Sequence, residues 1–306
     1  MGITEAILLT IATAATPLLI AAIGELVVER SGVLNLGVEG MMVLGAVGGF
    51  AAMSLTGNPW IGVVAAIAMG ALAALAFGFL TLSLAANQVA TGLSLTILGL
   101  GLSGLLGVEF VGKAGTKLEN ISIPVLSDIP LVGPLLFGQD PIFYMSIALV
   151  IGVSWFLFRT RPGLTLRSIG DNHVSAHALG IPVLRYRYLA VMFGGACAGL
   201  AGGHLSLVYT PVWIENMSAG RGWIALALVV FASWRPARVL AGAYLFGAVS
   251  IGQLHAQALG IAIPSQFLTA LPYVATIVVL VLISQNVRAT LINTPAMLGR
   301  AFVPDR

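Results

Sequence analysis

Long apolar stretches separated by short polar segments run through the whole chain. Most are about 20 residues long, enough for a helix to cross the hydrocarbon of a bilayer. The stretch 222–234 has only 13 residues, so we expect a broken or re-entrant helix buried by its neighbours. The pattern predicts an all-α integral membrane protein, a single domain over residues 1–306, with nine segments at 5–28, 33–55, 59–84, 88–111, 141–158, 188–210, 222–234, 237–256 and 266–284.

Composition supports the membrane assignment. The chain is 58% hydrophobic and 8% charged, whereas soluble domains carry about 25% charged residues. The first stretch lacks the basic region of a signal peptide, so we expect it to be a transmembrane helix. Cys197 is the only cysteine, which excludes an intramolecular disulfide.

Basic residues predict the orientation. Lys113, Lys117 and Arg221 fall on one side of the predicted segments, and eleven arginines fall on the other: Arg30, Arg159, Arg161, Arg167, Arg185, Arg187, Arg235, Arg238, Arg288, Arg300 and Arg306. The positive-inside rule places the eleven in the cytoplasm, so the small net charge of +3 orients helices and indicates no nucleic-acid partner. Nine segments then place the N-terminus outside and the C-terminus in the cytoplasm.

Two loops are long. Residues 112–140 form the predicted extracytoplasmic loop, a solvated or partly re-entrant cap. Residues 159–187 form the cytoplasmic loop, where Asp171 or Asn172 can cap a short helix from His173 to Leu179. Gly180 and Pro182 end that helix.

Small residues recur at helical spacing in two segments, as Gly70, Ala74 and Gly78 and as Gly195, Gly199 and Gly203. Such faces let helices approach closely in lipid. Packing within the chain is the favoured explanation, and a dimer face is the alternative.

Catalytic and nucleotide-binding motifs are absent from the sequence. It has no phosphate-binding G-x-x-x-x-G-K-[ST] loop and no protease-type arrangement within its spans. His173 and His177 are four residues apart, but no third ligand lies near in sequence, so we expect no metal site. Energy for any transport must come from a partner or from an ion gradient.

Polar residues inside the segments are candidates for function because they are costly in lipid. Glu25 and Glu29 share a helix face, and either a proton relay or a structural role beside Arg30 fits them. His204 either lines a path or packs. The candidates for a solute path, whose amides and hydroxyls can alternatively bond helix ends, are Asn35, Glu39, Asn87, Gln88 and Thr91.

Three motifs are more specific than the patterns above, because they resemble segments of a known family. ERSGVLNLGVEGMM at 29–42 and RGWIALA at 221–227, the latter followed by Trp234-Arg235-Pro236, resemble segments of permease subunits of bacterial nucleoside-type ABC importers. These belong with the ribose-type and branched-chain amino-acid permeases. SIGDN at 168–172, with Ala176 and Gly180, resembles the loop where such permeases meet their ATPase. This chain departs from the family at His173 and His177.

The resemblance implies a type II ABC importer permease-like bundle in the bacterial inner membrane. It implies three protein partners besides membrane lipid: an ATPase with tandem nucleotide-binding domains, a second and non-identical permease, and an extracytoplasmic solute receptor. ATP and Mg²⁺ would bind the ATPase, and this chain would carry no cofactor. The residues that would contact the ATPase are Gly170, Asp171, Asn172, His173, Ala176, His177 and Gly180.

The expected solute is a nucleoside, with simple sugars of the ribose type second. An ion-coupled secondary transporter and a non-transporting membrane scaffold are the alternatives from other classes. ATP-independent uptake that collapses with the ion gradient would indicate the first, and absence of flux with every partner present would indicate the second.

Overall fold

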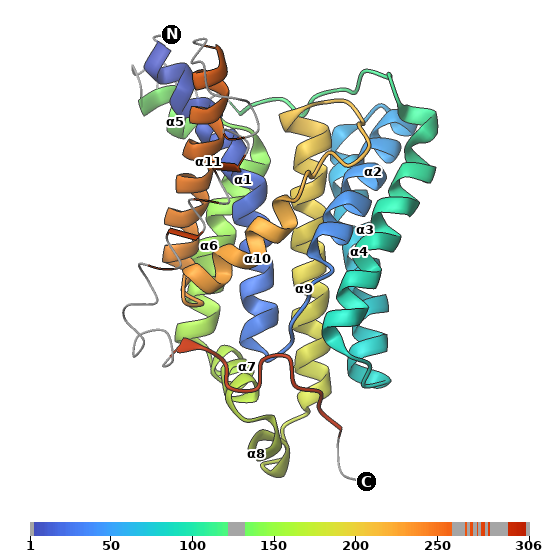
Figure 1. Cartoon of the computed structure of the whole chain (residues 1–306), viewed down its shortest axis with the longest axis vertical. Helices are drawn as coiled ribbons and strands as arrows, with labels where there is room; N and C mark the ends of the chain where they lie inside the picture. Colours follow the sequence, from blue (N-terminus) through green and yellow to red (C-terminus); the bar gives the residue numbers. More distant parts are fainter. Residues whose placement is uncertain are drawn as a thin grey trace.

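The computed structural model of the chain describes residues 3–121, 132–258 and 293–303, with isolated positions between 267 and 281. Helices make up the fold of these residues (Figure 1), and the only strand-like pairings in them are two isolated bridges. In chain order the helices are α1 (Ile3–Arg30), α2 (Val38–Thr56), α3 (Pro59–Gly78), the π-helix η1 (Phe79–Ser83), α4 (Gln88–Gly107), the 3-10 turn η2 (Val108–Phe110), α5 (Val132–Phe137), α6 (Pro141–Arg159), α7 (Arg161–Asp171), α8 (His173–Ala178), α9 (Val183–His204), the π-helix η3 (Leu205–Tyr209), α10 (Arg221–Phe231) and α11 (Pro236–Ala258).

Seven helices of the described residues are long and apolar enough to cross a membrane. They correspond to seven of the nine predicted segments, at 5–30, 38–56, 59–83, 88–110, 141–159, 183–209 and 236–257. The stretch 222–234 forms the 11-residue α10, which is short and packs against α1, α2 and α11, as predicted. The segment predicted at 266–284 lies outside the described residues apart from scattered positions.

Local sequence signals explain where helices begin. Asn58, Asn87 and Asp140 accept hydrogen bonds from backbone N–H groups in the first turns of α3, α4 and α6. Proline follows two of these caps, at Pro59 and Pro141, where its missing N–H costs nothing. Short polar residues before apolar runs therefore mark where these three helices begin.

α9 lies at the centre of the bundle and packs against α1, α2 and α3. A Cβ atom added to Gly70 would lie 2.1 Å from the Gly195 carbonyl oxygen, and one added to Gly199 would lie 2.2 Å from that of Ala66. Backbones that approach this closely leave no room for a side chain. The two small-residue faces thus pack on each other within the chain, which confirms the favoured explanation.

Between α1 and α2 the chain is not helical. Residues 31–37 turn back beside α4, so that α2 begins part-way up the bundle (Figure 1). Gly92 of α4 makes this possible, because its added Cβ would lie 2.8 Å from the Leu36 backbone nitrogen. Thr96 donates to the Leu36 carbonyl oxygen at 3.0 Å. We call residues 31–37 the unwound segment.

The long loops lie at opposite ends of the bundle (Figure 1). α7, α8 and residues 293–303 share one end, which we call the α8 end. The described part of 112–140 lies at the other end, where it contains α5 and where the Gly115 backbone N–H donates to the Pro211 carbonyl oxygen at 2.8 Å. Arginines from distant segments gather at the α8 end, as their assignment to one side predicts; Arg288 and Arg306 lie outside the described residues.

Candidate functional site

α8 forms a short capped helix, as predicted. The Asn172 side chain accepts a hydrogen bond from the Ser175 backbone N–H at 2.9 Å. Gly180 follows with a φ of +79°, a left-handed conformation that favours glycine. The loop therefore presents one defined helix at the α8 end.

The seven residues predicted to meet an ATPase divide into two groups. Gly170, His173 and Ala176 are buried against the bundle. The exposed group is Asp171, Asn172, His177 and Gly180. Only the second group is available to a partner chain.

Two residues that the sequence analysis did not select are prominent on the outside of this loop. Val174 and Leu179 are 60% and 81% exposed, although both side chains are large and apolar. Exposed apolar residues outside the membrane-spanning helices mark interaction surfaces when they gather in one place. The sequence could have indicated them, because the short helix between polar residues has more apolar residues than its anchoring to the bundle requires.

The buried side of α8 is anchored by His173. The Arg187 guanidinium of α9, fully buried, lies with Nη2 3.0 Å from His173 Nδ1. A guanidinium only donates, so Nδ1 carries no proton and His173 is neutral. Burial, then the positive charges of Arg187 and Arg300, lower the pKa of His173 below its usual value.

The first and second sequence motifs bind each other at the α8 end. Trp234 Nε1 donates to Glu29 Oε2 at 2.5 Å, and Arg30 Nη2 donates to the Trp234 carbonyl oxygen at 2.9 Å. Ser233 and Trp234 have φ of +49° and +53°, which costs non-glycine residues about 1–2 kcal/mol each. Glu29 and Arg30 thus hold a strained turn between α10 and α11, which favours the structural role.

Glu39 joins the same two motifs deeper in the bundle. Its buried carboxylate accepts hydrogen bonds from the Ser218 hydroxyl at 2.5 Å and from the Gly220 and Gly222 backbone N–H groups at 2.8 and 2.6 Å. These donors precede or begin α10, where a negative charge is stabilised by the helix dipole. Glu39 is therefore the N-terminal anchor of α10.

The unwound segment is held by side chains from both neighbouring helices. Asn35 donates to Glu25 through its backbone and its side-chain nitrogen, at 3.3 and 3.4 Å. Gln88 Oε1 accepts from the Leu34 backbone N–H at 2.8 Å. Gln88 Nε2 is buried and has no hydrogen-bond partner among the described residues, so it retains a donor for another group.

The five residues predicted for a solute path thus differ in their availability. Asn35 and Glu39 are buried and bonded within the chain. Asn87 is exposed and caps α4, Thr91 is half-buried on its first turn, and Gln88 lies between these and the unwound segment. The structure joins Gln88 to the unwound segment that contains Asn35, and Thr91 lies one turn further along α4.

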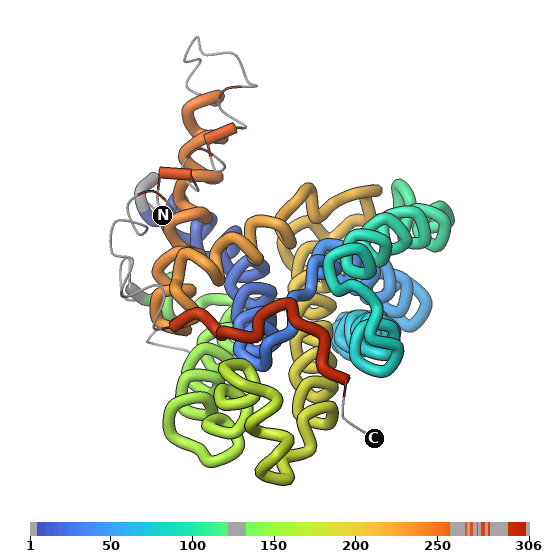
Figure 2. The backbone as a smooth tube through the Cα atoms, turned by 60° about the horizontal axis from the view of Figure 1, so that its bottom comes forward, coloured from blue at the N-terminus to red at the C-terminus, as the bar shows by residue number. Residues whose placement is uncertain are grey.

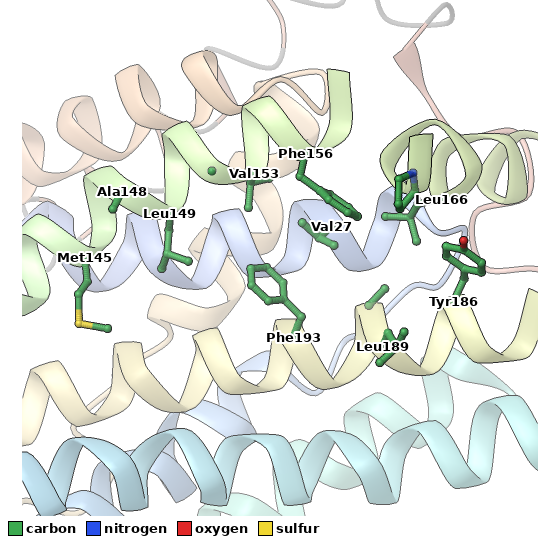
Figure 3. Close-up of a pocket in the computed structure, with 13 residues that line it drawn as sticks. Val27, Met145, Ala148, Leu149, Val153, Phe156, Leu166, Tyr186, Leu189 and Phe193 are labelled. Atoms are coloured by element: carbon green, nitrogen blue, oxygen red, sulfur yellow. The ribbon is translucent and has the colours of Figure 1, made fainter. Parts of the chain in front are cut away.

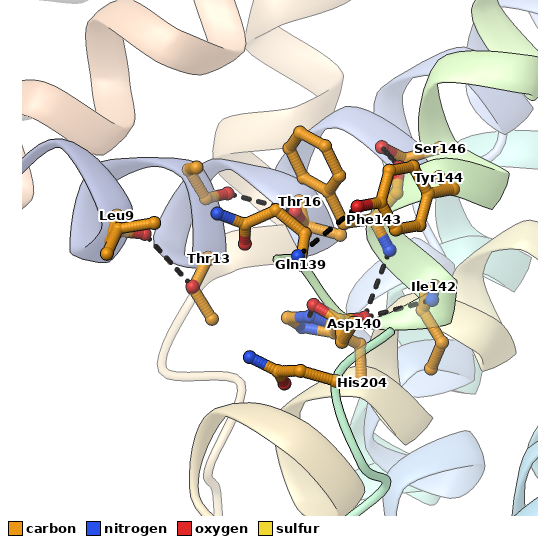
Figure 4. A network of polar contacts seen from close by, with 12 residues as sticks. Leu9, Thr13, Thr16, Gln139, Asp140, Ile142, Phe143, Tyr144, Ser146 and His204 are labelled. Carbon is orange, nitrogen blue, oxygen red and sulfur yellow. Dashed lines mark hydrogen bonds and ion pairs between the residues drawn. The ribbon is translucent and has the colours of Figure 1, made fainter. Parts of the chain in front are cut away.

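A second polar cluster lies toward the opposite end of the bundle (Figure 4). Asp140 Oδ1 caps α6, and its Oδ2 lies 3.6 Å from Nε2 of His204, a histidine with no exposed surface. Neither ring nitrogen of His204 has a hydrogen-bond partner among the described residues. Of the two explanations for His204, packing fits its burial, and Asp140 is a charged neighbour that spacing could not reveal.

One cavity of the described residues is lined by apolar side chains and is not a polar site. It has a volume of about 630 Å³ and opens between α6 and α9 (Figure 3). Met145, Leu149, Phe156 and Phe193 line it, and none of the five predicted path residues does. A polar solute there would lose its hydrogen bonds to water without replacement, so this cavity is unsuited to nucleosides or sugars.

Comparison with known proteins identifies the family. Residues 7–284 match the family described as branched-chain amino acid transport system / permease component. The chain is 43% identical over 289 residues to a putative glucose ABC transporter permease of Haloferax volcanii, covering 87% of this chain and 88% of the relative.

Two further relatives carry other substrate names. They are a guanosine ABC transporter permease of Bacillus subtilis, 34% identical over 282 residues, and a nucleoside ABC transporter permease of Lactococcus lactis subsp. cremoris, 32% identical over 280 residues. Each alignment covers 87% of this chain and 88% of the relative. This multi-pass membrane protein therefore belongs to the ABC transporter permease family of the branched-chain amino acid permease type.

Proposed function

We propose that the chain is the permease subunit of an ATP-driven importer that moves nucleosides by alternating access. Two of the relatives are named as guanosine or nucleoside permeases. The second candidate solute is a simple sugar, favoured by the 43% identity to the putative glucose permease. The chain itself carries no ATPase site in this proposal, and ATP with Mg²⁺ is bound and hydrolysed by a partner.

The proposed assembly contains four kinds of chain in a bacterial inner membrane. Beside this permease are a second, non-identical permease, an ATPase with tandem nucleotide-binding domains and an extracytoplasmic solute receptor. The α8 end faces the cytoplasm, and the N-terminus lies outside. The arginines gathered at the α8 end support this orientation, because basic residues are retained on the cytoplasmic side.

The observation that carries the proposal is the outer surface of α8. Asp171, Asn172, His177 and Gly180 are exposed there beside the apolar Val174 and Leu179. A short helix that carries Val174, followed directly by Leu179, suits insertion into a groove of the ATPase. Closure of the ATPase would then push on α8 and rock the helices packed behind it.

Substitution of Leu179 tests this docking surface. Leu179→Asp is expected to abolish co-purification of the ATPase, since a carboxylate would be buried without a partner. Leu55→Asp is the matched control, because Leu55 is 79% exposed at the other end of the bundle. Retention of the ATPase by Leu179→Asp would remove α8 as the docking element.

The proposed solute path runs between the two permeases rather than through the apolar cavity. Asn87, Gln88 and Thr91 would contact the solute, with Gln88 Nε2 supplying its unpartnered donor to a hydroxyl or base edge. Asn35 and Glu39 would shape the path by holding the unwound segment and α10. Gln88→Leu should raise the KM for uptake at unchanged ATPase docking, whereas an unchanged KM would place the path elsewhere.

Uptake into proteoliposomes that contain the complete complex tests the function. We expect ATP-dependent uptake of radiolabelled guanosine or adenosine, with ribose and glucose competing weakly. Preferential uptake of glucose would establish the sugar alternative. Uptake that needs an ion gradient and not ATP, or no flux of any solute, would overturn the proposal.

A further inference from the structure

Residues 293–303, which we call the strap, cross the α8 end and include a turn at 296–299 (Figure 2). The strap lies outside the three sequence motifs. It nevertheless contacts α1, α7, α8, α9 and the unwound segment, which makes it the element that joins the parts of this end.

Two buried arginines fix the strap near its ends. Arg30 Nη1 donates to the Asn293 carbonyl oxygen at 3.0 Å, and Arg187 Nη1 donates to the Arg300 carbonyl oxygen at 3.3 Å. Among the described residues, the other hydrogen bonds of both guanidiniums also go to backbone carbonyls or to His173, not to a carboxylate. Detachment of the strap would leave buried donors unpaired, which is costly.

Two backbone hydrogen bonds fix its middle. The Met297 N–H donates to the Gly170 carbonyl oxygen at 2.9 Å, and the Gly299 N–H donates to the Gly32 carbonyl oxygen at 3.1 Å. Gly170 lies in the last turn of α7, just before α8, and Gly32 belongs to the unwound segment. The strap therefore bonds the base of α8 and the unwound segment through residues two positions apart.

Phe302 attaches the strap to α8 itself. Its ring packs edge-on against His173 and His177, with centroids 5.2 and 5.4 Å apart. Phe302 is 7% exposed and forms a small apolar cluster with Ile169, Ala176 and Val183. Phe302 therefore contacts both His173 and His177 as well as this apolar cluster.

We propose that the strap transmits movement of α8 to the unwound segment and that Phe302 is the positioning residue that holds α8 to it. A push on α8 would be carried from Phe302 through Gly299 to Gly32, and so to the segment that Gln88 contacts. Arg187 of α9 forms a second connection, because it contacts His173 of α8 and donates to the Ser31 carbonyl oxygen at 3.1 Å. The strap adds a connection that runs through Phe302 and Gly299. The inference rests on the proposed ATP-driven transport, for which α8 is the point of contact.

Coupling between hydrolysis and transport tests the inference. In proteoliposomes with the complete complex, Phe302→Ala should lower the number of solute molecules moved per ATP by at least about fivefold, the lower range of coupling between sites. Phe302→Tyr keeps the aromatic ring and should have the wild-type number of solute molecules moved per ATP. Val303→Ala, at a neighbouring position that is 69% exposed, is the matched control and should leave it unchanged. An unchanged ratio in Phe302→Ala would overturn the inference.

A second measurement does not depend on transport. Hydrogen exchange of the Met297 and Gly299 amides in the purified chain should rise about tenfold in Phe302→Ala, because the strap opens more often. Unchanged exchange would show that Phe302 does not hold the strap. If Phe302→Ala fails to assemble, Phe302→Leu supplies both readouts, with a smaller fall in the ratio expected. Failure of the wild-type complex to move solute with ATP would instead refute the proposed function, while the exchange result stands.

Discussion

The buried carboxylate of Glu39 stabilises the packing of two segments that are about 180 residues apart in the chain. Three donors point at it, so Glu39→Ala leaves a hydroxyl and two backbone N–H groups buried without partners. Each such group costs about 1–3 kcal/mol. We expect a marked fall in the thermal midpoint of the detergent-solubilised protein.

Glu39→Gln should fall between Glu39→Ala and wild type. An amide oxygen can keep two of the bonds, but the NH₂ group would face the Gly222 N–H, a donor opposite a donor. Glu109→Gln, at an exposed carboxylate, is the control and should leave the midpoint unchanged. Equal midpoints for Glu39→Ala and Glu109→Gln would contradict the anchoring role.

His173 makes the α8 end sensitive to pH. Its pKa is lowered by burial and by Arg187 of α9 and Arg300 of the strap, so the folded chain favours neutral His173. Stability from this arrangement is fully present above the unfolded pKa of about 6.5 and is lost as the pH falls through the lower folded value. We expect the thermal midpoint to drop between pH 7.5 and pH 5, by an amount that the variant His173→Gln reduces.

The reason is that a glutamine oxygen can accept from Arg187 without taking up a proton. His255→Gln, at an exposed histidine, serves as the control and should retain the wild-type pH dependence. A pH dependence that is the same in His173→Gln and wild type would assign the effect to other groups.

At the scale of elements, the Asn172 cap tests whether α8 must be helical to dock. Asn172→Ala removes the bond to the Ser175 N–H, a loss of about 1 kcal/mol in helix stability. Asn172→Asp keeps an accepting oxygen and is the matched variant. We expect weaker ATPase binding for Asn172→Ala alone, measured by titration of the solubilised permease. Equal affinities of the two variants would show that the cap is not needed.

The contact between α3 and α9 tolerates no added atom. Gly199→Ala would place a Cβ 2.2 Å from the Ala66 carbonyl oxygen, so the helices must separate. We expect loss of monodisperse protein after solubilisation. Gly101→Ala in α4 is the control, since its added Cβ meets nothing within 4 Å. Normal yield and thermal midpoint for Gly199→Ala would mean that the two helices separate readily.

Sequence patterns predicted those elements that depend on neighbouring residues. Apolar length located the seven spans, and of the two residues predicted to cap α8, Asp171 and Asn172, the structure shows Asn172 as the cap, because capping is local. The unwound segment was missed, since residues 33–37 are mostly apolar and were included in a span from 33 to 55. Its conformation depends on Gln88 and Gly92, which are far away in sequence, and on Glu25, which lies ten residues before Asn35.

At the scale of the whole molecule, two residues predicted for a solute path make hydrogen bonds within the chain. Glu39 and Asn35 were candidates for a solute path because polar groups are costly in lipid. Their partners, Ser218 and Glu25, offset that cost inside the chain. The periodicity of the sequence cannot identify such pairs. It shows which polar residues lie within the segments, but it cannot distinguish a residue that lines a solute path from one that bonds two segments together.

The contact between the first and second motifs shows how the halves of the chain are joined. Trp234→Phe preserves most of the buried ring but removes the donor to Glu29 Oε2, which then faces apolar surroundings. The strained turn at Ser233 and Trp234 also loses its bond to Glu29, although Arg30 still donates to the Trp234 carbonyl oxygen. We expect a lower thermal midpoint together with faster proteolysis of the turn between α10 and α11.

Trp155→Phe is the matched control. Trp155 is 63% exposed on a membrane-facing helix, and among the described residues its side chain makes no hydrogen bond to another helix. The same ring change there should leave the midpoint nearly unaltered. A loss confined to Trp234→Phe would mean that the Glu29–Trp234 bond fixes the position of α11 relative to α1. Equal effects of the two substitutions would mean that the motifs are held together by apolar packing alone, since only the bond distinguishes the two sites.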